Sequence, residues 1–188
     1  MEVIKESSPE EAVLEWLKAE LNSDRFSDGL HAAVIALGYD EKVITEASIT
    51  DKQDNEVRWR ILKQYRSWLD RDFSNYAWQL VHLDREEVGN LKYIDYSYWN
   101  ELSEGTRKVG RAAMNVARGK IVFDVPHDRF HSVAKLVEAG ESLPPIIVVS
   151  GHEDNVGEIL EGHLRATGYV LAEQAKSPLL AVWGRLRK

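Results

Sequence analysis

The sequence predicts a fold of mixed α and β structure, in which helices come first and a mixed sheet follows. Apolar residues in the first 70 positions recur at three- and four-residue steps, which is typical of amphipathic helices. Aromatic and β-branched residues begin near Tyr76, which indicates a change to strands. From Leu143 onward, short apolar runs alternate with turn residues, as in an α/β unit. We therefore expect a helical subdomain over residues 1–72 and an α/β domain over residues 73–188.

Three helices are expected in the first part of the chain. Ser8, Pro9 and the two glutamates after them are typical of a helix start, and apolar residues follow at helical spacing up to Leu21. Gly38 is expected to end the second helix. The polar stretch 40–55 is expected to be rich in loops. The helices themselves are predicted near residues 8–21, 27–37 and 57–69.

The second part of the chain is expected to alternate strands with helices. Strands are predicted over residues 76–83, 144–149, 157–161 and 179–183, with a polar turn over 150–156. Helical segments are predicted over residues 84–88, 127–138 and 163–174 and within 99–118, and Gly140 is a natural helix stop.

Composition and charge argue against several classes of function. The chain contains no cysteine, which excludes disulfides and thiol nucleophiles, and its net charge of −7 opposes nonspecific binding to DNA or anionic membranes. Residues 1–70 carry 9 basic and 15 acidic side chains, whereas residues 71–188 are close to neutral. No apolar run is long enough to cross a bilayer, and no leader follows Met1. We expect a cytoplasmic protein that binds neither DNA nor membranes.

The turn Glu161-Gly162-His163-Leu164-Arg165 is the strongest candidate site. A helix N-terminus attracts anions, and Gly162 would let the backbone approach a ligand closely. Arg165 could hold phosphate oxygens, while His163 could donate a hydrogen bond or relay a proton. Arg107 could supply a second cation. The alternative is structural, with Gly162 serving a tight turn, His163 capping the helix and Arg165 pairing with a glutamate.

A carboxylate site and a metal site are the weaker possibilities. Glu161 could join acids near the end of the first strand, namely Asp84, Glu86 and Glu87, to bind Mg²⁺ or act as a general base. Solvated surface acids are the favoured interpretation of those residues. His127 and His131 lie four positions apart but lack an evident third ligand, so no metal site is predicted.

The C-terminal segment resembles ParB/sulfiredoxin-like domains. A proline-led strand at residues 143–149, a hairpin, and the Gly-x-x-Arg turn at 162–165 that opens a helix are similar to the signature of that family. The likeness covers about the last 110 residues, with additional material around residues 90–126. It implies a ParB/sulfiredoxin-like mixed-sheet domain, preceded here by the acidic helices.

Known activities of the family fit this chain only in part. ParB proteins bind a cytidine triphosphate through a turn with two arginines, and here Leu164 replaces one of them. Sulfiredoxins use a cysteine that this chain lacks. Free-serine kinases of the same fold carry histidine and arginine, which is closer to His163 and Arg165. The whole chain is also similar to a bacterial and phage group with a Glu-Gly-His-x-Arg turn, and that likeness implies no activity.

Two hypotheses of function follow. In the first, Gly162, His163, Arg165 and Arg107 bind a nucleotide or another phosphorylated small molecule, with Mg²⁺ as a possible companion. His163 and Glu161 would then be the catalytic candidates if the protein were a phosphotransferase or a nucleotide hydrolase. In the second, the fold is a noncatalytic interaction module whose acidic helices contact a protein partner, or a second copy in a homodimer.

Overall fold

The computed structural model describes residues 1–46, 48–152 and 156–188. In this part of the chain, a six-stranded mixed sheet has the strand order β1-β2-β6-β4-β5-β3. The strands are β1 (Glu2–Ser7), β2 (Tyr76–Leu83), β3 (Lys92–Tyr93), β4 (Ile146–Ser150), β5 (Glu158–Glu161) and β6 (Leu179–Leu186). The β6–β4 and β5–β3 pairs are parallel, and the other three pairs are antiparallel. The predicted mixture of α and β structure with a mixed sheet is confirmed.

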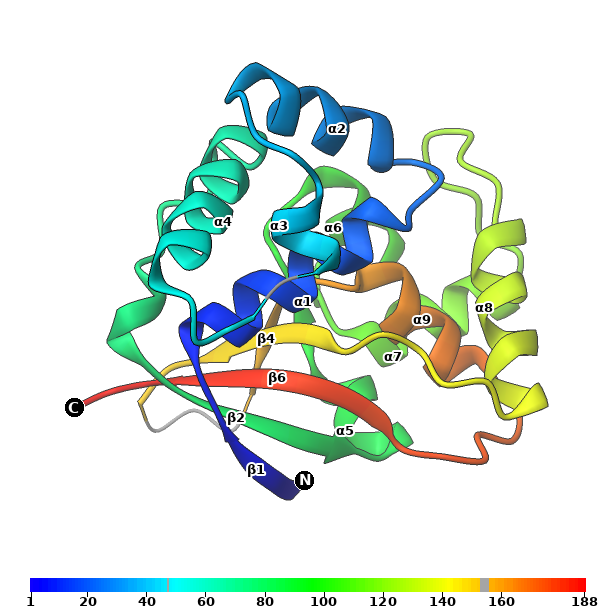
Figure 1. Cartoon of the computed structure of the whole chain (residues 1–188). Helices are drawn as coiled ribbons and strands as arrows, with labels where there is room; N and C mark the ends of the chain where they lie inside the picture. Colours follow the sequence, from blue (N-terminus) through cyan, green and yellow to red (C-terminus); the bar gives the residue numbers. More distant parts are fainter. Residues whose placement is uncertain (47, 153–155) are drawn as a thin grey trace.

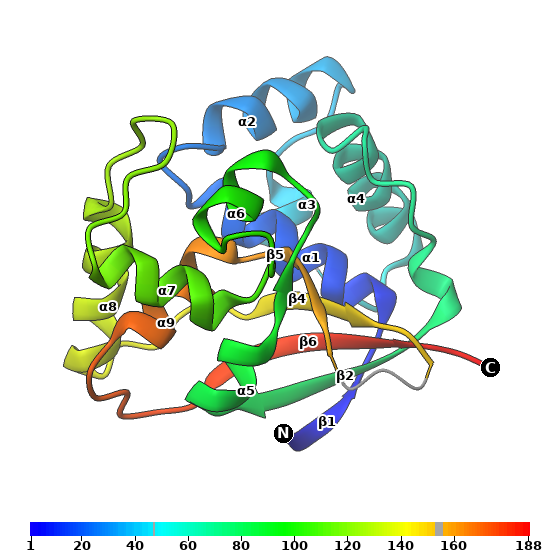
Figure 2. The same ribbon diagram turned by 180° about the vertical axis from the view of Figure 1, so that it is seen from behind.

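Helices cover both faces of the sheet. The first group is α1 (Pro9–Leu21), α2 (Ser27–Ala36), α3 (Lys42–Thr45) and α4 (Lys52–Tyr65), and it lies above the sheet in Figure 1. The second group is α5 (Arg85–Asn90), α6 (Ser97–Leu102), α7 (Val109–Ala117), α8 (Asp128–Ala139) and α9 (His163–Leu171). A short 3-10 helix at Phe73–Asn75 leads into β2. In Figure 2, α6 and α7 lie in front of the β5 end of the sheet.

Alternation along the strands divides the buried residues into two cores. On β4, Ile146 and Val148 face the core beneath α5–α9, while Ile147 and Val149 face the core beneath α1–α4. Because successive strand residues point to opposite faces, a strand buried on both sides must be apolar throughout, and β4 is. The N-terminal helices share their core with strand residues such as Trp78 and Val182.

Local sequence signals fix several of these elements. The Ser8 hydroxyl accepts a hydrogen bond from the Glu11 amide at 3.2 Å, which caps α1 as predicted. Asp84 and Glu87 form a reciprocal capping box on α5. Gly140 ends α8 in a left-handed conformation with φ of 89°. Strand β2 has the bounds predicted from the sequence.

Other elements depart from the predictions. Strand β1 lies in a segment where only helices were expected, because five of its six residues are exposed and it has no apolar face to signal a strand. The stretch expected to be loop-rich contains the short helix α3 and the first turn of α4. The polar turn predicted over residues 150–156 lies partly outside the described residues.

Candidate functional site

The predicted turn joins β5 to α9, and its glycine is required by the fold. Gly162 has a φ of 96°, a backbone conformation that residues with a Cβ rarely adopt. A Cβ at this position would lie 2.4 Å from Cγ2 of Ile146. Among the described residues, no side chain caps the N-terminus of α9 through a hydrogen bond. The turn therefore brings two strands close together and leaves the first turn of α9 without a side-chain cap.

Arg165 is engaged by the protein itself. Its Nη2 atom donates to the Glu161 carboxylate and to the backbone oxygen of Pro145, the latter at 3.1 Å. Both side chains are nearly buried, with 14% of Arg165 and 12% of Glu161 exposed. Burial raises the pKa of Glu161, and the Arg165 cation opposes that rise. The pairing predicted as the structural alternative is thus present, but Arg165 Nε is buried without a hydrogen-bond partner among the described residues.

His163 lies in an aromatic stack. Its ring is nearly parallel to those of Trp99 and Tyr93, with centroids 5.3 and 5.8 Å away. Burial, together with the nearby cations of Arg165 and Arg66, lowers the pKa of His163 to about 3. The imidazole is therefore neutral at pH 7. Its Nε2 atom is buried and has no hydrogen-bond partner in the described part of the chain.

Arg107 lies at the other end of β5 from the turn. Its guanidinium donates to the backbone oxygen of Tyr93, at 2.9 Å from Nε, and forms an ion pair with Glu158. Arg71 donates to the second oxygen of the same carboxylate at 2.5 Å. Glu158 and Glu161 begin and end β5, which separates them by about 10 Å of extended backbone. The structure does not bring Arg107 together with the predicted turn residues.

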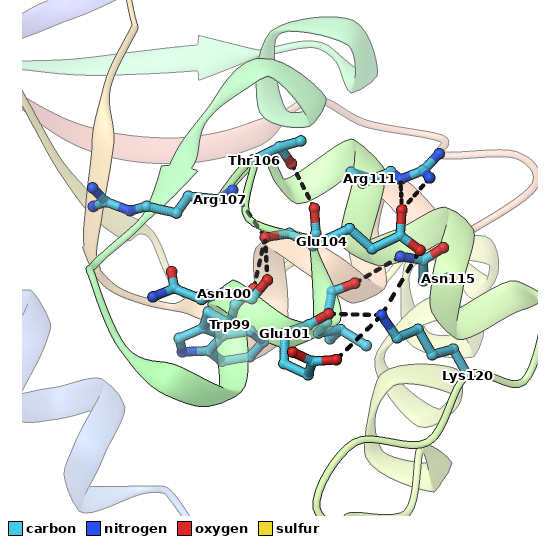
Figure 3. Close-up of polar contacts among 11 residues, drawn as sticks. Trp99, Asn100, Glu101, Glu104, Thr106, Arg107, Arg111, Asn115 and Lys120 are labelled. Carbon is cyan, nitrogen blue, oxygen red and sulfur yellow. Dashed lines mark hydrogen bonds and ion pairs between the residues drawn. The ribbon is translucent and has the colours of Figure 1, made fainter.

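A dense polar network holds the loop from which Arg107 projects. The Ser103 hydroxyl accepts from the Arg107 amide at 2.9 Å, and Asn115 donates to the backbone oxygen of Leu102 at 2.8 Å. Glu104 pairs with Arg111 and Lys120. Figure 3 shows the Arg107 side chain extending away from this cluster. These contacts hold the loop in an unusual backbone conformation, in which Glu104 and Arg107 have positive φ values of 54° and 58°.

Residues from the N-terminal helices approach the turn from the opposite layer. Glu20 on α1 is 2% exposed and pairs with Arg66, which follows α4. Trp16 and Tyr65 also donate to the Glu20 carboxylate, each at 3.2 Å. Glu20 and Arg66 both influence the pKa of Glu161. This cluster was not predicted, since no local pattern in the sequence links α1 to the end of α4.

The acids that were weighed as a weaker candidate for a carboxylate site have other partners. Asp84 and Glu87 cap α5, and Glu161 pairs with Arg165. Within residues 1–46, 48–152 and 156–188, no three side chains of His, Asp or Glu are grouped so that they could hold a metal ion. The pair His127 and His131 is accompanied by no third such group there.

A cavity of about 300 Å³ lies elsewhere, between the end of α8 and the start of β6. Val137, Leu143, Tyr169 and Leu179 contribute to its lining, which includes none of the predicted site residues. Its walls are mainly apolar.

Comparisons with protein-family models, with curated proteins and with solved structures find no match to this chain. The ParB/sulfiredoxin-like resemblance therefore remains a prediction. None of the helices in the described ranges combines the length and the apolar character needed to cross a membrane.

Proposed function

We propose that this protein binds a phosphorylated small molecule, with nucleotides as one class, at the turn between β5 and α9. Two buried nitrogen atoms carry the proposal: Arg165 Nε and His163 Nε2, neither of which has a hydrogen-bond partner among the described residues. Buried polar atoms in folded proteins nearly always have partners. Oxygen atoms and hydroxyl groups of a ligand would supply them here.

The electrostatics of the turn favour an anion. The first turn of α9 carries a partial positive charge, and Arg165 adds a guanidinium. Glu161 opposes binding while it is ionised, but burial raises its pKa, so protonation on ligand entry costs less than it would in water. Because Gly162 has no Cβ, no side chain at this position separates a ligand from the backbone.

Catalysis would place different demands on the same residues. His163 is neutral and could accept a proton from a ligand, whereas Glu161 is held by Arg165. A phosphotransferase or nucleotide hydrolase would also have to bring its metal with the nucleotide, as Mg²⁺–ATP does. We therefore propose binding as the function and treat turnover as a second measurement on whichever ligand binds.

The test is a thermal-shift and calorimetric screen of phosphate, pyrophosphate, glucose 6-phosphate, AMP and CTP, each with and without Mg²⁺. A ligand at about 100 times its Kd should stabilise the fold by roughly 2.7 kcal/mol. Arg165→Lys keeps the charge but removes Nε, so it should weaken binding at least tenfold. Arg118→Lys on the exposed surface is the matched control. Absence of any shift with well-folded wild-type protein would refute the proposal.

A second candidate function, interaction with a protein partner, is favoured by an exposed apolar turn. Phe123 and Asp124 have φ values of 51° and 55°, and the Val125 amide donates to the backbone oxygen of Val122 at 3.0 Å. Phe123 is 64% exposed, between Ile121 at 54% and Val125 at 41%. Left-handed backbone at non-glycine residues is costly, so a turn that presents Phe123 to solvent in this way is typical of a recognition surface.

Sedimentation of wild type and Phe123→Ser between 1 and about 200 µM tests the simplest partner, a second copy of the chain. Association of the wild type that is lost in the variant would support this function. A wild-type monomer throughout the range would exclude self-association through the turn.

A further inference from the structure

Two more buried polar atoms without partners among the described residues belong to residues that are connected to the β5–α9 turn by packing. They are Arg66 Nε, at the end of α4, and the hydroxyl of Tyr98 on α6. The Tyr98 ring packs edge-on against Trp99 at 4.9 Å, and Trp99 stacks on His163. Arg66 pairs with Glu20, which accepts a hydrogen bond from Trp16. Trp16 belongs to the same apolar core as Leu160 of β5. The four unpartnered atoms thus come from the residue that follows α4, from α6 and from the first turn of α9.

Arg66 is held rigidly before any ligand arrives. One of its terminal nitrogens donates to Glu20, and its guanidinium lies 4.3 Å from the ring centroid of Tyr65 and 4.8 Å from that of Phe26. Each of these contacts restricts the side chain, so the direction of its Nε–H bond is fixed. A fixed donor binds a ligand oxygen without a further loss of conformational entropy.

We propose that Arg66 and Tyr98 are binding residues for the same ligand, which α9, α6 and the end of the N-terminal helical group hold between them. This inference rests on the proposed function and deepens it. Arg66 Nε and Arg165 Nε are donors and require acceptor oxygens, which a phosphoryl group provides. The Tyr98 hydroxyl can donate to the same group or accept from another part of the ligand.

His163 adds a requirement for a donor on the ligand. The backbone of Ile159 slightly opposes the lowering of the His163 pKa, as a carbonyl oxygen near the ring would. Because Nε2 has no partner in the described part of the chain, we assign the ring proton to Nδ1, facing that oxygen. In the neutral ring, Nε2 is then the acceptor nitrogen. The ligand class that satisfies all four atoms is a phosphate ester that also carries a hydroxyl group, such as a sugar phosphate or a nucleotide.

Calorimetry with three probes tests both parts of this inference. AMP and glycerol 1-phosphate each carry a phosphate and a hydroxyl, whereas methyl phosphate has no hydroxyl. We expect the first two to bind at least tenfold more tightly than methyl phosphate. Equal affinity of methyl phosphate and glycerol 1-phosphate would overturn the requirement for a hydroxyl donor.

Tyr98→Phe is the most informative variant, because it removes a single oxygen atom. The free variant should melt at the wild-type temperature or above it, since a buried hydroxyl without a partner costs stability. Its affinity for the tightest probe should fall about tenfold. Tyr96→Phe, at a tyrosine that is 55% exposed, is the matched control and should bind as the wild type does. Arg66→Lys keeps the charge beside Glu20 but removes Nε, and it should also weaken binding about tenfold.

The outcomes separate this inference from the proposed function. If no probe binds the wild type, the proposed function fails, and the inference fails with it. If the wild type binds and Arg165→Lys weakens binding, but Tyr98→Phe and Arg66→Lys bind within twofold of the wild type, only the inference fails. Loss of stability in free Tyr98→Phe with unchanged affinity would show that water, and not the ligand, satisfies the hydroxyl.

Discussion

Glu20 of α1 and Arg66 at the end of α4 form an ion pair across 46 residues of sequence, and the carboxylate is almost completely buried. Trp16 and Tyr65 also donate hydrogen bonds to the Glu20 carboxylate. Such a pair contributes little to the stability of the fold compared with a well-packed apolar pair. Loss of one partner is nevertheless costly, because it leaves a buried charge without a counter-ion. The pair therefore makes the position of α4 relative to α1 sensitive to single substitutions.

Glu20→Gln should destabilise the protein by about 2 kcal/mol, a value reduced from that of fully buried pairs because 18% of Arg66 is exposed. Urea unfolding measures the change. Glu15→Gln is the control, since Glu15 pairs with Lys18 near the surface, and it should cost less than about 0.5 kcal/mol. Equal losses in the two variants would show that burial of Glu20 is not what matters.

Gly162→Ala should cost roughly 3 kcal/mol, because it combines an unfavourable backbone conformation with a close contact to Ile146. Gly38→Ala separates the two causes. Gly38 also has a positive φ, of 74°, but no atom of the described residues lies within 4 Å of the place that a Cβ would take, so about 1 kcal/mol is expected. Thermal and urea unfolding measure the loss of stability in both variants. Similar losses would show that the close contact with Ile146 contributes nothing.

Arg58 on α4 is fully buried and satisfies the backbone oxygens of Val43 and Ser48, each at 2.9 Å. Arg58→Met should cost about 2–4 kcal/mol, because both oxygens lose their charged donor. Hydrogen exchange should show the loss first around α3. Arg60→Met, on the exposed side of the same helix, should change stability by less than about 0.5 kcal/mol. An Arg58 variant as stable as the Arg60 variant would contradict this role.

His163 should make the protein less stable in acid. Its folded-state pKa of about 3 lies below the ordinary value of 6.5, so the unfolded chain binds the extra proton first as pH falls. Stability from this group is complete above pH 6.5 and is lost progressively down to about pH 3. At pH 4.5 the loss should be roughly 3 kcal/mol relative to pH 7.5.

His163→Gln should flatten this dependence, and urea unfolding at the two pH values measures it. Glu161 acts in the opposite direction, because its raised pKa favours the folded state in acid, but it contributes equally to wild type and variant. An unchanged difference between pH 7.5 and 4.5 in the variant would assign the acid sensitivity to other groups.

Sequence patterns predicted the elements whose signals are local. Strand β2 was predicted because its aromatic and β-branched residues lie between turn residues. The turn at Gly162 was predicted because a glycine separates an apolar strand from residues with helical spacing. Strand β1 was missed because its pairing with β2 joins residues more than 70 positions apart, and its side chains are exposed.

The same distinction applies to the candidate site. The nearness of Glu161 and Arg165 in the sequence allowed their pairing to be considered, since the tight turn at Gly162 places the first turn of α9 beside the end of β5. No spacing relates Arg66 or Tyr98 to His163, so their approach to the turn depends on how the two helical layers pack on the sheet. Arg107 was assigned to the turn, but its position is set by Glu158 and Tyr93.

The strand order also constrains how the protein is made. β6 is the last strand in sequence, yet it lies between β2 and β4 and pairs with both. During synthesis, β1 with β2 can form only a two-stranded ribbon, and β4, β5 and β3 only a separate three-stranded piece, until residues 179–186 leave the ribosome. The two-stranded ribbon is marginally stable in water, and the sheet closes late through contacts distant in sequence. Nascent chains thus leave the facing edges of β2 and β4 unpaired until β6 has been made and can pair with both.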